Sequence, residues 1–253
     1  MDMDIEMELG ALGLSPKTWP EVLDSIRNRL NPQDWDTFSR LHRNFAGYRS
    51  ESTHARFYGF VFSRGLQLEM NMYRHARLKA VLEGLAAEVA PGISILDIGA
   101  GAGIPASILM RTRSPARYVV QDPCAEAREA LHSQGFSVLP HPPPVSPDGG
   151  GFDLLICIDS LGEINSDDDG ILKDPESVEP LHLPDLLEQR FGFVQKLRSW
   201  KPYVAPGGRI LLWEPFTHQA IWRALADSLR ESGWQTRLAG DEPGRTYLRI
   251  EPK

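Results

Sequence analysis

The first ninety residues place their apolar positions at helical spacing, which predicts a helical region. Two amphipathic stretches cover residues 19–30 and 32–42. The clearest helix covers residues 68–89 and ends at the Pro91-Gly92 pair. Its apolar face consists of Leu78, Val81, Leu82, Leu85 and Val89. We therefore expect an N-terminal helical region over residues 1–90, which would cover a substrate pocket.

From residue 93 the pattern changes to short apolar runs that alternate with amphipathic stretches. The runs contain many β-branched residues, as buried parallel strands do. The predicted strands cover residues 93–98, 117–121, 136–139, 152–158, 209–214, 235–238 and 246–250, and the predicted helices cover residues 102–111, 123–133, 183–200 and 219–232. Such alternation predicts an α/β fold with a doubly wound sheet, held by residues 91–253.

The composition narrows the class of protein. Of 253 residues, 42% are hydrophobic and 24% are charged, which is ordinary for a globular domain. No run of 18 apolar residues is present, and the acidic start MDMDIEMELG lacks the basic and apolar parts of a signal peptide. Cys124 and Cys157 are too few for a disulfide framework and lack the close partners of a zinc site. We expect a cytoplasmic protein without a membrane span.

The net charge of -7 is unevenly distributed. Residues 1–39 carry -5, residues 40–79 carry +6, and residues 80–253 carry -8, much of it within the acidic stretch 163–188. A globally acidic chain disfavours non-specific nucleic-acid binding, which depends on neutralising phosphates. The basic block still allows a local anion site.

The segment ILDIGAGAG, from Ile95 to Gly103, carries the strongest chemical signal because it follows a predicted strand and opens a helix. Gly99 and Gly101 let the backbone turn sharply and approach a ligand closely. Asp97 lies where it can accept hydrogen bonds from a ligand amine or from the loop. Asp122 ends the next predicted strand, close to the position of a ribose-binding acid in nucleotide folds. It could equally cap the following helix, and the two roles can coexist.

The glycines form G-x-G-x-G, whereas the fingerprint of dinucleotide oxidoreductases is G-x-G-x-x-G. The loop resembles the first motif of the class I S-adenosylmethionine-dependent methyltransferases. The resemblance continues in order through Asp122, the segment FDLLICID that ends at Asp159, and the segment PGGRILL that starts at Pro206. Over residues 93–253 it implies a seven-stranded Rossmann-like methyltransferase sheet and S-adenosylmethionine as cofactor.

Two further segments are similar to the ribosomal small-subunit methyltransferase-like proteins of bacteria and mitochondria. These are DSLGEI, which starts at Asp159, and GGRILLWEP, which starts at Gly207. The chain lacks the cysteine cluster of several of those proteins and is shorter. An alternative function is therefore a ribosomal RNA methyltransferase or a ribosome-assembly factor.

Methyl transfer depends mainly on in-line placement of the acceptor, and a base is needed only where the acceptor must lose a proton. Glu163, which follows the fourth strand, and Glu214 and His218, which follow the fifth, are the candidate catalytic residues. Each could instead cap a helix or face solvent. Asp159, directly after the fourth strand, is expected to contact the cofactor.

The resemblance also implies that an upstream tyrosine or basic side chain faces the methionine carboxylate of the cofactor. Tyr73 and Arg74 are the candidates. Arg74 and Arg77 are three residues apart, so both could contact one anion, although an exposed basic helix face would give the same pattern.

We expect no metal, because Asp167, Asp168 and Asp169 lack the spacing of a calcium loop. The favoured function is an S-adenosylmethionine-dependent methyltransferase that acts on O or N of a small-molecule acceptor, with RNA a less favoured partner. A binding scaffold that has lost activity is the third alternative.

Overall fold

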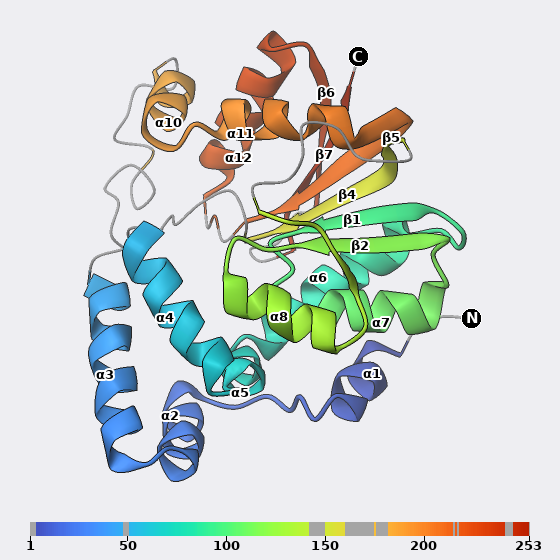
Figure 1. Ribbon diagram of the computed structural model, residues 1–253. Helices are drawn as coiled ribbons and strands as arrows, with labels where there is room; N and C mark the ends of the chain where they lie inside the picture. The colour runs from blue at the N-terminus through green and yellow to red at the C-terminus, as the bar shows by residue number, and fades with distance from the viewer. Residues whose placement is uncertain are drawn as a thin grey trace.

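The computed structural model describes residues 4–47, 51–141, 150–159, 175, 182–214, 216, 218–240 and 245–252 (Figure 1). Its centre is a seven-stranded sheet with the order β3-β2-β1-β4-β5-β7-β6. The strands are β1 (Ser94–Ile98), β2 (Arg117–Gln121), β3 (Ser137–Val138), β4 (Phe152–Ile158), β5 (Val204–Trp213), β6 (Trp234–Ala239) and β7 (Tyr247–Pro252). Neighbours pair in parallel except at β7, which is antiparallel to β5 and β6. The predicted seven-stranded, doubly wound sheet is confirmed.

Helices cover both faces of this sheet. One face is covered by α1 (Ile5–Ala11), α6 (His75–Glu88), α7 (Ile104–Arg113) and α8 (Ala125–Ser133), and the other by α10 (Leu183–Phe191), α11 (Phe193–Trp200) and α12 (Gln219–Glu231). Because strand side chains alternate, Ile95 of β1 packs in the first layer, whereas Leu96 and Ile98 pack in the second. None of the described helices is long and apolar enough to cross a membrane.

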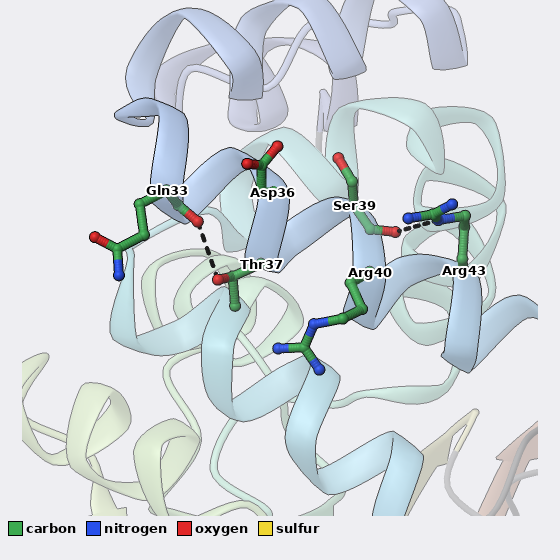
Figure 2. A pocket seen from close by; sticks show the side chains of 6 residues that line it. All are labelled: Gln33, Asp36, Thr37, Ser39, Arg40 and Arg43. Carbon is green, nitrogen blue, oxygen red and sulfur yellow. Dashed lines mark hydrogen bonds between the residues drawn. The ribbon is translucent and has the colours of Figure 1, made fainter.

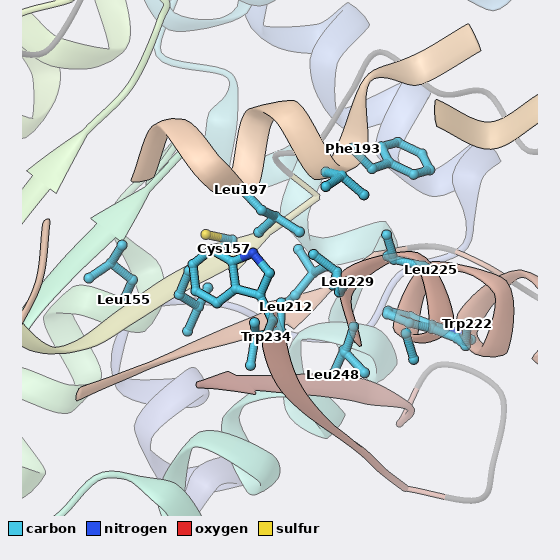
Figure 3. Packing of buried hydrophobic residues seen from close by; sticks show 14 of the residues in the cluster. Leu155, Cys157, Phe193, Leu197, Leu212, Trp222, Leu225, Leu229, Trp234 and Leu248 are labelled. Atoms are coloured by element: carbon cyan, nitrogen blue, oxygen red, sulfur yellow. The ribbon is translucent and has the colours of Figure 1, made fainter. Parts of the chain in front are cut away.

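The second layer holds a large apolar cluster, shown in Figure 3. Trp222 and Leu225 of α12, Leu212 of β5, Leu197 of α11 and Cys157 of β4 all belong to this cluster. The Cys157 thiol is free and fully buried, so it serves as a small core side chain.

The N-terminal helices α2 (Trp19–Arg29), α3 (Pro32–Gly47), α4 (Glu51–Ser63) and α5 (Gln67–Tyr73) enclose an apolar cluster of their own. Phe57 of α4 stacks on Phe45 of α3 with ring centroids 4.8 Å apart. This region meets the sheet layers where α4 crosses α8. A Cβ atom at Gly59 of α4 would lie 3.2 Å from a carboxylate oxygen of Glu126 in α8. A helical N-terminal region is present as predicted, and a domain boundary near residue 90 stays a prediction.

Several predicted boundaries differ from the structure because the amphipathic pattern continues through residues where the backbone leaves the helical conformation. The predicted helix over residues 68–89 divides at Arg74 into α5 and α6, and that over residues 183–200 divides at Gly192, whose φ is +61°. Strand β5 begins at Val204, and its pairing with β4 is irregular between Phe152 and Leu154. Helices α1 and α4 were missed, and the predicted turn at residues 241–244 lies outside the described residues.

The close packing of α6 on the sheet gives a stability prediction. A Cβ atom at Gly84 would lie 2.9 Å from the Trp213 ring, which is fully buried and has no room to move. We expect Gly84→Ala to lower the free energy of unfolding by about 1 to 3 kcal/mol, the usual result of overpacking, although alanine is the better helix former. Gly10→Ala in α1 is the control, because nothing lies within 4 Å of its Cβ position. Urea unfolding of both variants checks this, and a Gly84→Ala protein as stable as wild type would contradict it.

Candidate functional site

The carboxyl ends of β1, β2, β4 and β5 meet at one edge of the sheet. The register pairs Ile98 with both Gln121 and Cys157, and Ile158 with Trp213. The predicted residues Gly99, Gly101, Asp122, Asp159 and Glu214 follow these strand ends, so the fold brings them to the same edge. This is the edge at which open α/β sheets bind their ligands.

The glycine-rich loop at this edge needs glycine for its backbone shape. Gly99, Gly101 and Gly103 have φ values of 74°, 53° and 70°, in the left-handed region that other residues rarely adopt. Gly99 donates its N–H to the Gln121 carbonyl at 2.8 Å, which ties the loop to the end of β2. At Gly103 a Cβ atom would lie 2.7 Å from a Leu131 side-chain carbon, so α7 begins tightly against α8.

Asp122 fastens this loop to the start of α8. One of its carboxylate oxygens accepts the N–H of Gly101 and the other accepts the N–H of Cys124, each at 2.8 Å. Burial raises the pKa of Asp122, although the two backbone N–H groups oppose the shift. An ionised carboxylate has about four lone-pair positions, so two remain for ligand hydroxyl groups. The cap-like role and a ligand role are compatible in this geometry.

Asp97 lies beneath the loop and is only 1% exposed. Burial raises its pKa to about 7, and the Tyr118 hydroxyl, which donates to it at 3.1 Å, offsets part of the shift. The nearby Asp122 carboxylate raises it further. A cation next to Asp97 would therefore lower its pKa and stabilise its ionised form.

Arg74 and Arg77 both approach the Asp159 carboxylate. Arg77 contacts it through two nitrogens, Nη2 and Nε, and Arg74 Nη1 lies 3.8 Å from it. The two arginines therefore share one anion, but that anion is the protein's own Asp159 carboxylate. Their contact with the cofactor carboxylate stays a prediction. The Tyr58 hydroxyl of α4 also raises the pKa of Arg74, and its contribution exceeds that of Asp159. Tyr73 is 56% exposed, and its ring lies 5.4 Å from that of Trp19.

The three catalytic candidates differ in what the structure describes of them. Glu214 directly follows β5 and is 2% exposed. His218 is partly exposed and occupies the N-cap position of α12. Glu163, with most of the acidic stretch 163–188, lies outside the described residues. Their roles stay predictions.

Two site features were missed by sequence reasoning. The Gln121 amide contacts His141 Nδ1 at 2.8 Å beside Asp122, although His141 lies in a segment predicted only as irregular loop. Gln121 also lines a cavity of about 20 Å³, one water in size, together with Leu139 and Tyr203. Arg77 was noted, but its partner Asp159 is 82 residues away and no local signal links them.

A separate group of polar side chains lies along one helix, α3 (Figure 2). It consists of Gln33, Asp36, Thr37, Ser39, Arg40 and Arg43. Arg40 and Arg43 of α3 and Arg56 of α4 are exposed. None of the three forms an ion pair with another residue that the structure describes. These arginines belong to the basic block of residues 40–79. Within the described ranges, no three His, Cys, Asp or Glu side chains form a group that could hold a metal ion.

The raised pKa of Asp97 makes stability depend on pH in a defined direction. Between its usual value of 3.8 and about 7, folded Asp97 keeps its proton while the unfolded chain has lost it. Folding therefore takes up a proton, and the free energy of unfolding falls by about 1.4 kcal/mol per pH unit as the pH rises through this window. Asp97→Asn removes this dependence.

We expect the stability of Asp97→Asn relative to wild type to grow by about 2 kcal/mol from about pH 5 to about pH 6.5. Urea unfolding at both pH values measures it, and other titrating groups cancel in the difference. A stability difference that does not change with pH would contradict the raised pKa.

No protein-family model and no curated protein matches the chain. Solved structures similar to it include a ribosomal protein L11 methylase from Lactobacillus delbrueckii subsp. bulgaricus, at 14% identity over 71% of this chain and 80% of that one, with a TM-score of 0.45. A methyltransferase from Pyrococcus furiosus is 13% identical over 68% of this chain and 81% of its own, with a TM-score of 0.43.

A third similar structure is an S-adenosylmethionine-dependent methyltransferase from Bacteroides fragilis in complex with S-adenosyl-L-homocysteine. It is 17% identical over 67% of this chain and 75% of that one, with a TM-score of 0.41. Sequence identities and TM-scores this low do not show that the proteins share an activity. By its own sheet order and glycine-rich loop, the chain has the fold of the class I S-adenosylmethionine-dependent methyltransferases.

Proposed function

We propose that the protein is an S-adenosylmethionine-dependent methyltransferase that acts on O or N of a small-molecule acceptor. The observation that carries the proposal is the buried Asp122 carboxylate, which accepts the Gly101 N–H at the carboxyl edge of a parallel sheet. A rigid glycine loop and a carboxylate with spare lone pairs together suit the ribose of an adenosyl ligand.

The residues at the edge fit the remaining parts of this cofactor. Asp122 would accept the two ribose hydroxyl groups. Arg74, whose side chain is 43% exposed, keeps donors for the methionine carboxylate. Asp97, neutral or ionised near pH 7, would be ionised by a neighbouring ammonium or sulfonium charge.

S-adenosylmethionine supplies an electrophilic methyl group when bound, and the protein has to place an acceptor in line with it. Placement in a preorganised site supplies most of the acceleration. Glu214 and His218 follow β5 at the same edge of the sheet, where a side chain can take a proton from an acceptor hydroxyl or ammonium. Glu163 is the third proposed base. Helices α2 to α5 would form the wall of the acceptor pocket, since α4 lies against α8 beside Asp122.

The second candidate function is that of a ribosomal RNA methyltransferase or a ribosome-assembly factor. The exposed arginines on α3 and α4, Arg40, Arg43 and Arg56, favour it because each could neutralise a phosphate. Against it, the chain as a whole has a net charge of -7.

The ribose role of Asp122 predicts a loss of cofactor affinity. We expect Asp122→Asn to weaken S-adenosylhomocysteine binding by about 1 to 3 kcal/mol, the effect of leaving a hydrogen-bonding group unsatisfied. Isothermal titration calorimetry measures it. The control is Asp153→Asn, because Asp153 also accepts a backbone N–H, from Ser94 at 2.7 Å, but at the opposite edge of the sheet. Equal affinities of the two variants would remove the ribose assignment.

The acceptor class is tested by transfer of a labelled methyl group. Purified protein and methyl-labelled S-adenosylmethionine are added to a lysate of the native host, and the products are separated into RNA, protein and small-molecule fractions. We expect label in the small-molecule fraction above a control with the Asp122→Asn protein. Label in RNA would establish the second candidate instead. Absence of label in every fraction, with cofactor binding intact, would point to a binding scaffold.

A further inference from the structure

Asp159 has an unusual backbone for its residue type. Its φ is 52°, and among the described residues only Ser114 is another non-glycine residue with a positive φ. Its N–H donates to the Trp213 carbonyl at 2.8 Å, which holds the end of β4 to the end of β5. Aspartate and asparagine tolerate this conformation better than most residues, but the surroundings have to hold it there.

The surroundings that hold Asp159 are on α6 and the turn before it. Arg77 contacts both carboxylate oxygens, one through Nη2 and the other through Nε at 3.4 Å. Arg74 approaches only one oxygen, at 3.8 Å. The exposed fractions follow the same order, since the side chains of Arg77 and Asp159 are 22% and 28% exposed and that of Arg74 is 43% exposed.

The two arginines therefore differ in how many guanidinium donors remain for a ligand. Arg77 uses the two-nitrogen edge of its guanidinium on Asp159, which is the strongest and most directional form of this pair. Arg74 lies farther from Asp159 and also has the Tyr58 hydroxyl of α4 beside it. One carboxylate cannot neutralise two guanidinium groups, and a tyrosine hydroxyl carries no charge near pH 7. A net positive charge remains on the more exposed arginine, next to the end of β4.

We propose that the Asp159–Arg77 pair is a clasp that fixes the first turn of α6 against the end of β4 and so keeps Arg74 oriented toward the carboxylate of the cofactor. Asp159 and Arg77 are positioning residues in this arrangement, and Arg74 is the ligand-binding residue. The inference rests on the proposed function. If Asp159 instead merely occupied the anion site and competed with the cofactor, its removal would tighten binding, so the sign of the change separates the two arrangements.

The test compares two ligands that share an adenosine group. S-adenosylhomocysteine carries the amino-acid carboxylate, and 5′-methylthioadenosine lacks it. We expect Arg77→Gln and Asp159→Asn each to weaken S-adenosylhomocysteine binding about tenfold, and the double variant to lose little more, because both singles break the same pair. Asparagine keeps the left-handed backbone accessible. Affinity for 5′-methylthioadenosine should change by less than about twofold.

Lys79→Gln is the matched control, since Lys79 lies on the same helix and pairs with Glu6 of α1 at 2.6 Å, away from the sheet edge. It should leave both affinities unchanged. Unchanged or tighter S-adenosylhomocysteine binding by Arg77→Gln and Asp159→Asn would overturn the clasp, as would an equal loss for both ligands. Failure of the wild-type protein to bind S-adenosylhomocysteine at all would overturn the proposed function as well.

Discussion

The two backbone hydrogen bonds that Asp122 accepts are the constraint on which the candidate site depends. They join the glycine-rich loop after β1 to the start of α8 after β2, and both loops then share one buried carboxylate. Parallel pairing of Ile98 with Gln121 brings the two loops to the same level. Burial makes the charge of Asp122 costly, and the backbone N–H groups offset that cost. A shape that needs three glycines with positive φ is thereby held in one conformation.

Around Asp122, the acidic side chains at the edge of the sheet lie near basic side chains that the helices contribute. Asp97, Asp122 and Glu214 are buried at or just after the ends of three strands. The charge of Asp122 raises the pKa of Asp97, and hydrogen bonds to Asp97 and Asp122 oppose the effect of burial. Asp159 has two arginines instead. The acids at this edge thus come from the sheet, whereas the two arginines come from α6 and the turn before it. The close packing of α6 on β5 at Gly84 therefore helps to place these positive charges beside Asp159.

The sequence predicted the parts of this arrangement that depend on local periodicity. The strands, the glycine loop and Asp122 follow from patterns within about 30 residues, the size of one βαβ unit. The division of the helical stretch at Arg74 could not be predicted, because the amphipathic pattern runs on through it. The partners Gln121 with His141 and Arg77 with Asp159 depend on which strands and helices become neighbours. Helix α4 has a weakly amphipathic sequence, and its place is set by the aromatic cluster around Phe57.

The same division separates what fixes the cofactor from what fixes the acceptor. The groups proposed to bind the cofactor, Asp97 and Asp122, are attached to β1 and β2, where short strands and tight turns leave little freedom. Acceptor choice would depend on the segments after β4 and β5 and on helices α2 to α5, which are joined to the sheet mainly by α4 against α8 and by α5 leading into α6. A conserved scaffold with variable walls is how one fold serves many substrates. Arg40, Arg43 and Arg56, which form no ion pair within the described part of the chain, would belong to those walls, so we expect them to affect acceptor binding and not cofactor binding.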